Sequence, residues 1–216
     1  MYEDAHARAA AEEYLGHIRR HLREQFGDRT LDILDAGCQA GRLLIPLAEE
    51  GHRLIGVDTS GFALRRARRH AQERGLSVRL HCGDLTSLRR WVRPSSLDAV
   101  ICAEVLYLCE NYRALLRLLA ESVKSGGLVG ISHRPAAFYV ANAQAQGRQD
   151  LAADIARRRE GPTADSAYHN WQTEPELRDW YRDEGLRVAG CYPVDYTTLG
   201  PDGRVPQYLL MMAQKP

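Results

Sequence analysis

The sequence predicts an α/β fold in which helices cover both faces of a mostly parallel sheet. In the segment 31–58, a short apolar run ends on Asp35, a glycine turn and a helical pattern follow, and a second β-rich run ends on Asp58. Strand, glycine turn, helix, strand and acid make up one half of a nucleotide-binding sheet. A nearly continuous apolar run over 97–102 is typical of a strand that is buried on both faces.

The glycine turn indicates which kind of nucleotide fits. A dinucleotide fold has the pattern Gly-x-Gly-x-x-Gly, because the pyrophosphate lies on a helix N-terminus and the backbone must approach it closely. Counted from Gly37, that pattern needs two further glycines where this chain has Gln39 and Arg42. Asp35, just before the turn, would also repel a pyrophosphate. An acid, a glycine turn and a later acid at Asp58 suit a ligand with a cationic amino acid end and a free ribose, which is S-adenosylmethionine (SAM).

Four segments, in this order and spacing, resemble the class I SAM-dependent methyltransferases. They are Asp35-Ala-Gly-Cys-Gln-Ala-Gly41, Gly56-Val-Asp58-Thr-Ser60, Gly83-Asp84-Leu85 and Asp98-Ala-Val-Ile-Cys-Ala-Glu-Val-Leu106. The resemblance covers about residues 30–133, and Gln39 replaces one glycine of the usual Gly-x-Gly-x-Gly of that family. It implies a Rossmann-like, seven-stranded sheet, SAM as the cofactor and S-adenosylhomocysteine as its product.

The resemblance assigns most cofactor contacts to residues at the ends of the first four strands. Asp58 is expected to accept hydrogen bonds from the ribose hydroxyls. Asp84 is expected to accept one from the adenine amino group, and it could also cap the turn that follows it. The expected cofactor-binding residues are Tyr14, Asp35, Gly37, Cys38, Gly41, Asp58, Thr59, Asp84, Leu85, Cys102 and Ala103.

Composition and charge narrow the class of protein. The 216 residues include 29 basic and 28 acidic side chains, so no global field favours nucleic acid or an anionic membrane. The five cysteines form no Cys-x-x-Cys pair, which disfavours a disulfide framework and a zinc site and fits a reducing compartment. No secretory signal or membrane-spanning run is visible. We expect a cytoplasmic protein, monomeric or homodimeric, that acts without a membrane or nucleic acid.

Two parts of the chain are expected to cover the bound ligands. The resemblance implies that residues 1–29 form a helical lid in which Tyr2 and Tyr14 contact SAM, although a helix simply packed on the sheet explains the same pattern. Residues 30–216 are expected to form the SAM-binding methyltransferase domain. Within it, the insertion 134–172 is too long for a passive connection, and the resemblance implies that it covers the substrate.

Hydrophobic periodicity and turn signals give the expected elements. Helices are expected at 3–26, 41–51, 60–74, 111–123, 136–146, 150–159 and 173–183. Strands are expected at 31–35, 53–57, 77–82, 97–102, 128–132, 186–192 and 207–213, with a turn at 125–127 and another at 200–203.

Methyl transfer from a sulfonium depends mostly on alignment and on the exclusion of water, so a base is needed only if the acceptor loses a proton. His133, after the fifth strand, is the expected general base, unless its ring merely bonds a loop carbonyl. Glu104 and Tyr107 are expected at the same carboxyl end of the sheet as His133. There they would bind substrate, orient His133 or simply pack against neighbouring side chains. The expected substrate-binding residues are Arg134, through a carboxylate of the acceptor, and an aromatic cover of Tyr139, Tyr168, His169 and Trp171.

The resemblance implies methyl transfer to an oxygen or nitrogen of a small molecule. One alternative is an RNA or protein acceptor, which would need a basic surface. The arginine run at 65–69 is the only feature of the sequence that suggests such a surface. Another is a regulatory or scaffold protein that binds SAM without transfer. Base-modifying amino-methyltransferases have (Asn/Asp)-Pro-Pro-(Tyr/Phe) where this chain has Cys102-Ala-Glu-Val-Leu-Tyr107. This difference disfavours that class of enzyme. No metal is expected, because Asp98 lies at the wrong end of its strand and Ser132-His133-Arg134 offers no acid.

Overall fold

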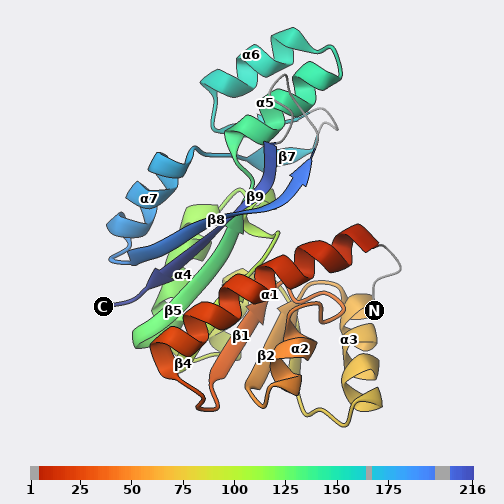
Figure 1. Cartoon of the computed structure of the whole chain (residues 1–216), viewed down its shortest axis with the longest axis vertical. Coiled ribbons are helices and arrows are strands. Elements are labelled where there is room, and N and C mark those ends of the chain that lie inside the picture. Colours follow the sequence, from red (N-terminus) through yellow and green to blue (C-terminus); the bar gives the residue numbers. More distant parts are fainter. Residues whose placement is uncertain (1–4, 164–166, 198–204) are drawn as a thin grey trace.

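The structure is a computed structural model that describes residues 5–163, 167–197 and 205–216 (Figure 1). Its main strands are β1 (Asp32–Ala36), β2 (Arg53–Asp58), β3 (Arg79–Cys82), β4 (Leu97–Cys102), β5 (Val123–His133), β8 (Arg187–Thr197) and β9 (Val205–Gln214). They form a seven-stranded sheet in the order β3-β2-β1-β4-β5-β9-β8. Strands β1 to β5 run parallel, whereas β9 pairs antiparallel with both β5 and β8. The predicted seven-stranded, mostly parallel sheet is confirmed.

Helices cover both faces of this sheet, as predicted. One face carries α1 (Ala5–Phe26), α2 (Leu44–Glu49) and α3 (Gly61–Glu73), and the other carries the 3-10 helix η1 (Leu85–Arg90), α4 (Tyr112–Ser122) and α7 (Glu174–Asp183). Side chains alternate between the faces along each strand, so Ile33 belongs to the core under α1 whereas Leu34 belongs to the core under α4. The two cores cover both faces of the sheet and leave the carboxyl ends of its strands free for binding.

Capping residues set where two of the helices begin. The Ser60 hydroxyl accepts a hydrogen bond from the N–H of Ala63 (3.2 Å) and starts α3. At α7, Thr173 and Glu176 form a capping box, in which the Glu176 carboxylate accepts from the Thr173 N–H (2.8 Å). Both starts were readable from the sequence because each cap is a local contact.

Several observed elements differ from the predicted ones, and β8 ends five residues later than predicted. Helix α2 begins at Leu44 because the preceding residues are taken up by the glycine turn. Strand β5 is longer than predicted, and the expected turn at 125–127 lies inside it. The polar stretch near 160–170 forms a small antiparallel hairpin of β6 (Glu160–Pro162) and β7 (Tyr168–Asn170). The expected turn at 200–203 lies outside the described residues, as does Tyr2.

The insertion has a small core of its own. Helices α5 (Ala136–Ala145) and α6 (Gln149–Arg157) stand off one end of the sheet together with β7 (Figure 1). Trp171 is fully buried among Phe138, Tyr139 and Ile155. Its indole N–H donates to the carbonyls of Ile155 and Arg158, both at 3.0 Å. The insertion is therefore a packed unit beside the sheet.

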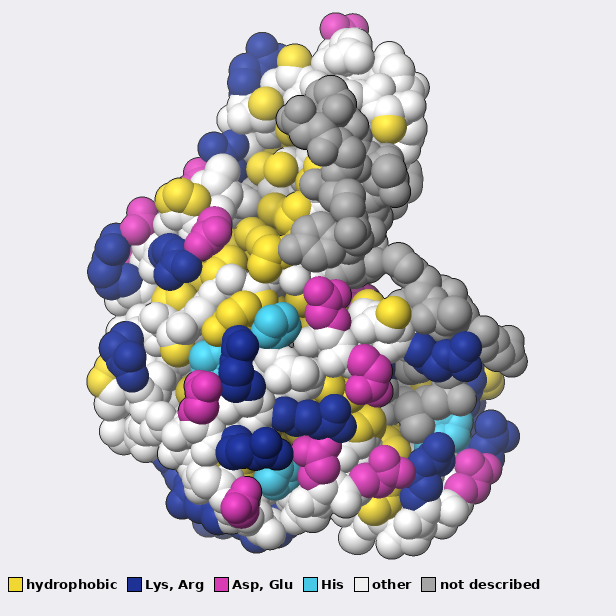
Figure 2. All heavy atoms as spheres, viewed as in Figure 1, with side chains coloured by type: hydrophobic (Ala, Val, Ile, Leu, Met, Phe, Trp, Pro, Cys, Tyr) yellow, Lys and Arg dark blue, Asp and Glu magenta, His cyan; other side chains and the backbone are white. Residues whose placement is uncertain are grey.

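On the face that carries α1, the described side chains form no large patch of a single charge. In Figure 2, basic and acidic side chains are interspersed over that face, as the balanced composition predicts. Within the described ranges, no helix is long and apolar enough to cross a membrane.

Candidate functional site

A cavity of about 690 Å³ lies at the carboxyl ends of β1 to β4. This is the edge at which an open parallel sheet binds its ligands. Its walls come from the segments that follow the four strands and from η1. The lining residues are Asp35, Gly37, Cys38, Gln39, Arg42, Leu43, Val57, Asp58, Thr59, Ser60, Ala63, Gly83, Asp84, Leu85, Ala103, Glu104, Val105, Tyr107, Leu108, Cys109, Asn111 and Leu115.

The glycine turn after β1 brings bare backbone to the cavity. Gly37 has φ +81°, and a Cβ there would lie 2.2 Å from Cγ2 of Val105. The Gly37 N–H donates to the carbonyl of Val57 (2.8 Å), which ties the turn to β2. Gln39 adopts φ +45°, a left-handed conformation that costs a side-chain residue about 1–2 kcal/mol. The turn keeps its glycine-like course although Gln39 replaces a glycine.

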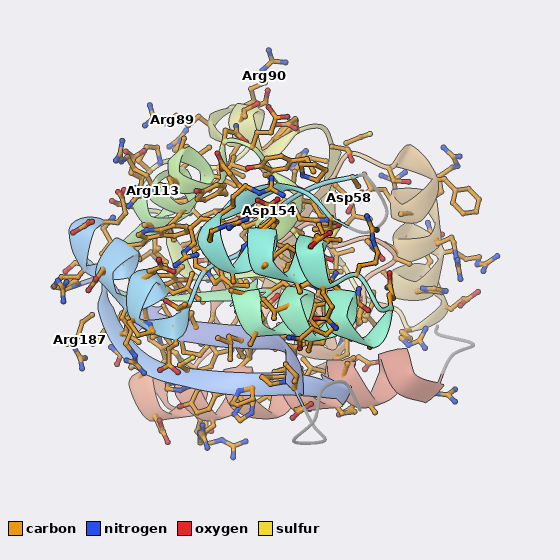
Figure 3. The ribbon with its side chains drawn as sticks, turned by 90° about the horizontal axis from the view of Figure 1, so that it is seen from above. Asp58, Arg89, Arg90, Arg113, Asp154 and Arg187 are labelled. Carbon is orange, nitrogen blue, oxygen red and sulfur yellow. The ribbon has the colours of Figure 1, made fainter. Side chains whose placement is uncertain are left out.

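Two acids stand at the ends of neighbouring strands, both held by backbone groups. The Asp58 carboxylate accepts from the N–H of Gln39 (2.9 Å) and from that of Ser60 (2.8 Å). Asp84 caps η1 by accepting from the N–H of Thr86 (2.7 Å), and hydrogen bonding from the Thr86 side chain, followed by that from its N–H, lowers the pKa of Asp84. Figure 3 shows Asp58 on the side of the molecule that carries α3. Both carboxylates are thus fixed in place and line the cavity.

Asp35 is the buried acid of the site, with 3% of its surface exposed. Desolvation raises the pKa of this carboxyl to about 7, against the opposing effects of the Arg42 guanidinium and the Leu44 N–H. The negative charge of Asp58 adds to the upward shift of the Asp35 pKa. A cationic group bound in the cavity would therefore favour the ionised form of Asp35.

Arg42 and Glu104 form an ion pair within the cavity, between the glycine turn and the segment after β4. Glu104 has φ +62°, and its N–H donates to the Ser132 hydroxyl (2.6 Å), which fixes this unusual backbone. The Arg42 guanidinium lies 5.7 Å from the centre of the Tyr14 ring. This end of the cavity therefore offers one positive and one negative group at close range.

Most of the predicted cofactor-binding residues line this cavity, as do Glu104 and Tyr107. Three predicted residues do not line it. Tyr14 is fully buried behind Arg42, and Cys102 is fully buried in β4. Gly41 makes room for α2 instead, since a Cβ there would lie 2.8 Å from Ile45.

His133 does not lie in the cavity, although the sequence predicts it as a general base. Its side chain is 2% exposed, and its Nε2 is 3.0 Å from the hydroxyl of Tyr181 on α7. Burial lowers the pKa of His133 to about 3, so the ring is neutral at ordinary pH. The physical reason is the alternation along β5, because Ser132 contacts Glu104 whereas His133 packs against the opposite layer.

A second cavity of about 310 Å³ lies in the insertion, between α5 and the β6–β7 hairpin. Its lining residues are Arg134, Phe138, Tyr139, Asn142, Gln146, Thr163 and His169. Three of the predicted substrate-binding residues are among them, namely Arg134, Tyr139 and His169. Two are not, because Tyr168 donates its hydroxyl to Glu160 (2.9 Å) and Trp171 belongs to the core of the insertion.

Tyr107 lies between the two cavities. It lines the first cavity, and its ring stacks against the ring of His169 from the second, with centroids 5.8 Å apart. The Arg134 guanidinium lies 4.3 Å from the centre of the same Tyr107 ring. The short 3-10 helix η2 (Leu106–Leu108), which contains Tyr107, is therefore a shared wall.

Comparison with known families decides the class of the domain. Residues 33–127 match the sequence model of a family described as a methyltransferase domain. This part of the chain is a class I methyltransferase domain. The matched range contains the glycine turn, both strand-end acids and Glu104, so it includes most of the first cavity.

Curated relatives and solved structures agree with this class. The chain is 34% identical over 118 residues to a ubiquinone biosynthesis O-methyltransferase of Idiomarina loihiensis, covering 55% of this chain and 47% of the relative. The enzyme of the same name from Nitrosospira multiformis is 32% identical over 149 residues, covering 64% and 60%. The chain thus spans about half the length of the curated relatives it matches.

Two solved structures show the same fold as this methyltransferase domain. Magnesium protoporphyrin IX methyltransferase from Synechocystis, with bound S-adenosylhomocysteine, superposes with a TM-score of 0.70 at 22% identity, covering 96% of this chain and 84% of that one. The 1,6-didemethyltoxoflavin-N1-methyltransferase of Burkholderia thailandensis gives a TM-score of 0.65 at 20% identity, covering 99% and 79%.

Some residues of the site were missed by the sequence analysis. Arg42 was used only as a departure from the dinucleotide pattern, although its place after the glycine turn makes it a lining residue of the first cavity. Phe138 and Asn142 on α5 and Gln146 at its C-cap follow one another at four-residue spacing, and that spacing was the signal for a shared face. Among the described residues, no three His, Cys, Asp or Glu side chains are grouped to hold a metal ion.

Proposed function

We propose that the chain is a SAM-dependent methyltransferase that transfers a methyl group to an oxygen or nitrogen of a small molecule. The observation that carries the proposal is the order of polar groups along one cavity. Asp84, Asp58, Gly37 and Glu104 lie at the carboxyl ends of β3, β2, β1 and β4, which are neighbours in that order. Adjacent strands lie about 4.8 Å apart, so these four ends span roughly 14 Å. An extended nucleoside that carries an amino acid side chain fits such a row.

The order of these polar groups also indicates how the cofactor is oriented in the cavity. Each Asp58 oxygen accepts one backbone hydrogen bond and keeps a further lone pair for a ribose hydroxyl. Asp84 would accept from the adenine amino group, next to the apolar wall formed by Leu85. The bare backbone at Gly37 allows the ligand to lie close, because a Cβ there would already contact Val105. At the other end, Arg42 and Glu104 would bind the carboxylate and the ammonium group.

When bound, SAM supplies a methyl group on a positively charged sulfur. The chain contributes alignment and the exclusion of water, with Tyr107 placed between the cofactor cavity and the second cavity. We retain Glu104 and Tyr107 as the residues that orient the reacting groups, since they line the cavity whereas His133 is sealed off from it. We also retain α1 as a cover for the cofactor end, where Tyr14 supports Arg42 from behind.

Two observations favour a small acceptor over RNA or protein. The second cavity is of the size that suits a compact ligand, at the low end of the range for small-molecule sites. The interspersed charges of Figure 2 offer no basic track for a nucleic acid on that face. The curated relatives are named ubiquinone biosynthesis O-methyltransferases, which favours oxygen over nitrogen as the receiving atom.

Calorimetric titration with SAM and S-adenosylhomocysteine tests the cofactor. We expect saturable binding of both, weakened at least tenfold (about 1.4 kcal/mol) in Asp58→Ala, because the ribose hydroxyls lose their acceptor. The matched control is Asp150→Ala, an exposed acid on α6 outside both cavities. Failure of the folded wild-type protein to bind either compound would refute the proposal. Transfer of a labelled methyl group to a panel of small phenols and amines then separates an enzyme from a regulator that only binds SAM.

The Arg42–Glu104 pair gives a second prediction. Arg42→Ala and Glu104→Gln should each weaken S-adenosylhomocysteine at least tenfold, yet leave methylthioadenosine unchanged, because that compound lacks the amino acid end. Titration of both ligands into both variants measures this, and retained methylthioadenosine binding shows that the fold is intact. Arg178→Ala, which breaks a surface ion pair with Glu174, serves as the control. Equal weakening of both ligands would contradict the proposed orientation.

A further inference from the structure

In the part of the chain that the structure describes, rings and amides make up most of the lining of the second cavity, together with one permanently charged side chain. Phe138 and Tyr139 contribute from α5, and His169 contributes from β7. Among the described residues that line it, Arg134 carries the only permanent charge and none is acidic. A volume of about 310 Å³ admits a ligand of one or two rings. The described lining therefore suits a flat, compact ligand whose anionic end lies at Arg134.

Arg134 is held for recognition by the rings around it. Its guanidinium lies 4.3 Å from the ring centre of Tyr107, 4.7 Å from that of Tyr208 and 4.9 Å from that of Phe138. It also donates to the Tyr208 hydroxyl. A guanidinium stays charged and is weakly hydrated, so it keeps its charge in this half-buried setting and pairs with carboxylates through two parallel hydrogen bonds. Since ring faces fix its plane, little conformational freedom is lost on binding.

The wall between the cavities is also rigid. The Asn170 carboxamide, 1% exposed, donates to the carbonyl of Leu106 (2.8 Å) and to that of Cys109 (3.1 Å), and so fixes the turn that carries Tyr107. A ring bound against His169 and Arg134 would lie next to Tyr107, on the side away from the first cavity. Its substituents could then reach past Tyr107 toward the cofactor cavity.

We propose that the second cavity is the acceptor site and that its ligand is an aromatic carboxylic acid of one or two rings, bound through its carboxylate to Arg134. This inference rests on the proposed methyltransferase function and adds the chemical class of the acceptor. The carboxylate end lies at Arg134, and a hydroxyl elsewhere on the ring receives the methyl group. The hydroxyl gives up its proton to solvent water as the new oxygen–carbon bond forms, and the sulfur–carbon bond breaks with its electron pair left on the sulfur of S-adenosylhomocysteine.

The test compares an aromatic acid with its neutral amide. Protocatechuate and its amide are titrated into wild type, Arg134→Gln, Arg134→Lys and Arg157→Gln, each saturated with S-adenosylhomocysteine. Wild type should bind the acid at least tenfold tighter than the amide. Arg134→Gln should lose that preference, Arg134→Lys should keep part of it because its charge remains, and Arg157→Gln should keep it fully, since Arg157 is an exposed arginine of α6 outside the cavity.

The outcomes distinguish this inference from the function on which it rests. If wild type does not bind S-adenosylhomocysteine, the proposed function fails first. If it binds S-adenosylhomocysteine normally, then equal affinity for acid and amide, no binding of the acid, or an unchanged preference in Arg134→Gln would each overturn the aromatic-acid inference alone. Unchanged S-adenosylhomocysteine affinity in Arg134→Gln shows that the variant is folded.

Discussion

Replacing Gly37 by alanine is expected to weaken S-adenosylhomocysteine binding more than a hundredfold and to destabilise the fold by about 2–4 kcal/mol. The residue has φ +81°, and the new Cβ would lie 2.2 Å from Cγ2 of Val105. Val105 must then move, and with it the neighbouring Glu104 at the amino acid end of the proposed cofactor site. Urea unfolding measures the loss of stability, and calorimetry measures the loss of affinity.

Gly51 provides a matched control for the backbone effect. It has φ +87°, yet a Cβ there would meet nothing within 4 Å. Gly51→Ala should therefore cost only the left-handed backbone term, about 1 kcal/mol, and leave ligand binding unchanged. Adding Val105→Ala to Gly37→Ala should restore part of the lost stability, because the clashing methyl group is removed. Equal effects of the two glycine variants would show that the contact with Val105 is unimportant.

The parts of the site that the sequence predicted are those whose chemistry is local. Asp35, Asp58 and Asp84 each end or follow a strand, and parallel strands bring their carboxyl ends to one edge of the sheet. Their meeting in one cavity follows from strand order alone. Arg42 and Glu104 are 62 positions apart, and their ion pair depends on how the glycine turn packs against the segment after β4. No local pattern indicates such a contact.

His133 shows why a position at the end of a strand is not sufficient to assign a role. Side chains alternate between the two faces, so a difference of one residue decides whether a side chain enters the site or the opposite core. Ser132 contacts the Glu104 backbone, whereas His133 packs on Tyr181. The sequence places both at the end of the same strand. The facing direction depends on the pairing of β5 with its neighbours, which the sequence pattern left open.

The sequence predicted the insertion as a whole, but it did not show which of its aromatic rings pack in a core and which border a cavity. Trp171, Tyr139 and His169 all follow the fifth strand in a polar, aromatic context. Trp171 became the centre of a core because two carbonyls satisfy its indole N–H, while Tyr139 and His169 border the second cavity. Composition does not separate a packed ring from one that faces a ligand. That difference lies in the tertiary contacts of α5 and α6.

Asp35→Asn is expected to stabilise the ligand-free protein increasingly as the pH rises. Burial raises the pKa of Asp35 from 3.8 to about 7, so between these values the folded chain binds a proton that the unfolded chain has released. The free energy of unfolding of the wild type therefore falls as the pH rises through this window, by up to about 4 kcal/mol. Asparagine has no such charge, and the advantage of the variant over wild type should grow by that amount between about pH 4 and pH 8.

His133→Gln is the matched variant, because the same linkage acts on it with the opposite sign. Burial lowers the pKa of His133 from 6.5 to about 3, so in this window the unfolded chain binds the proton and acid destabilises the wild type. The advantage of His133→Gln over wild type should therefore grow as the pH falls, by about 2 kcal/mol between roughly pH 6.5 and pH 4.5. Urea unfolding of the three proteins across this range measures both slopes.

In the wild type the two terms oppose each other between about pH 4 and pH 6.5, so its stability should vary less with pH than that of either variant. Parallel curves for all three proteins would mean that neither group changes its pKa on folding, and that neither burial governs the response to acid.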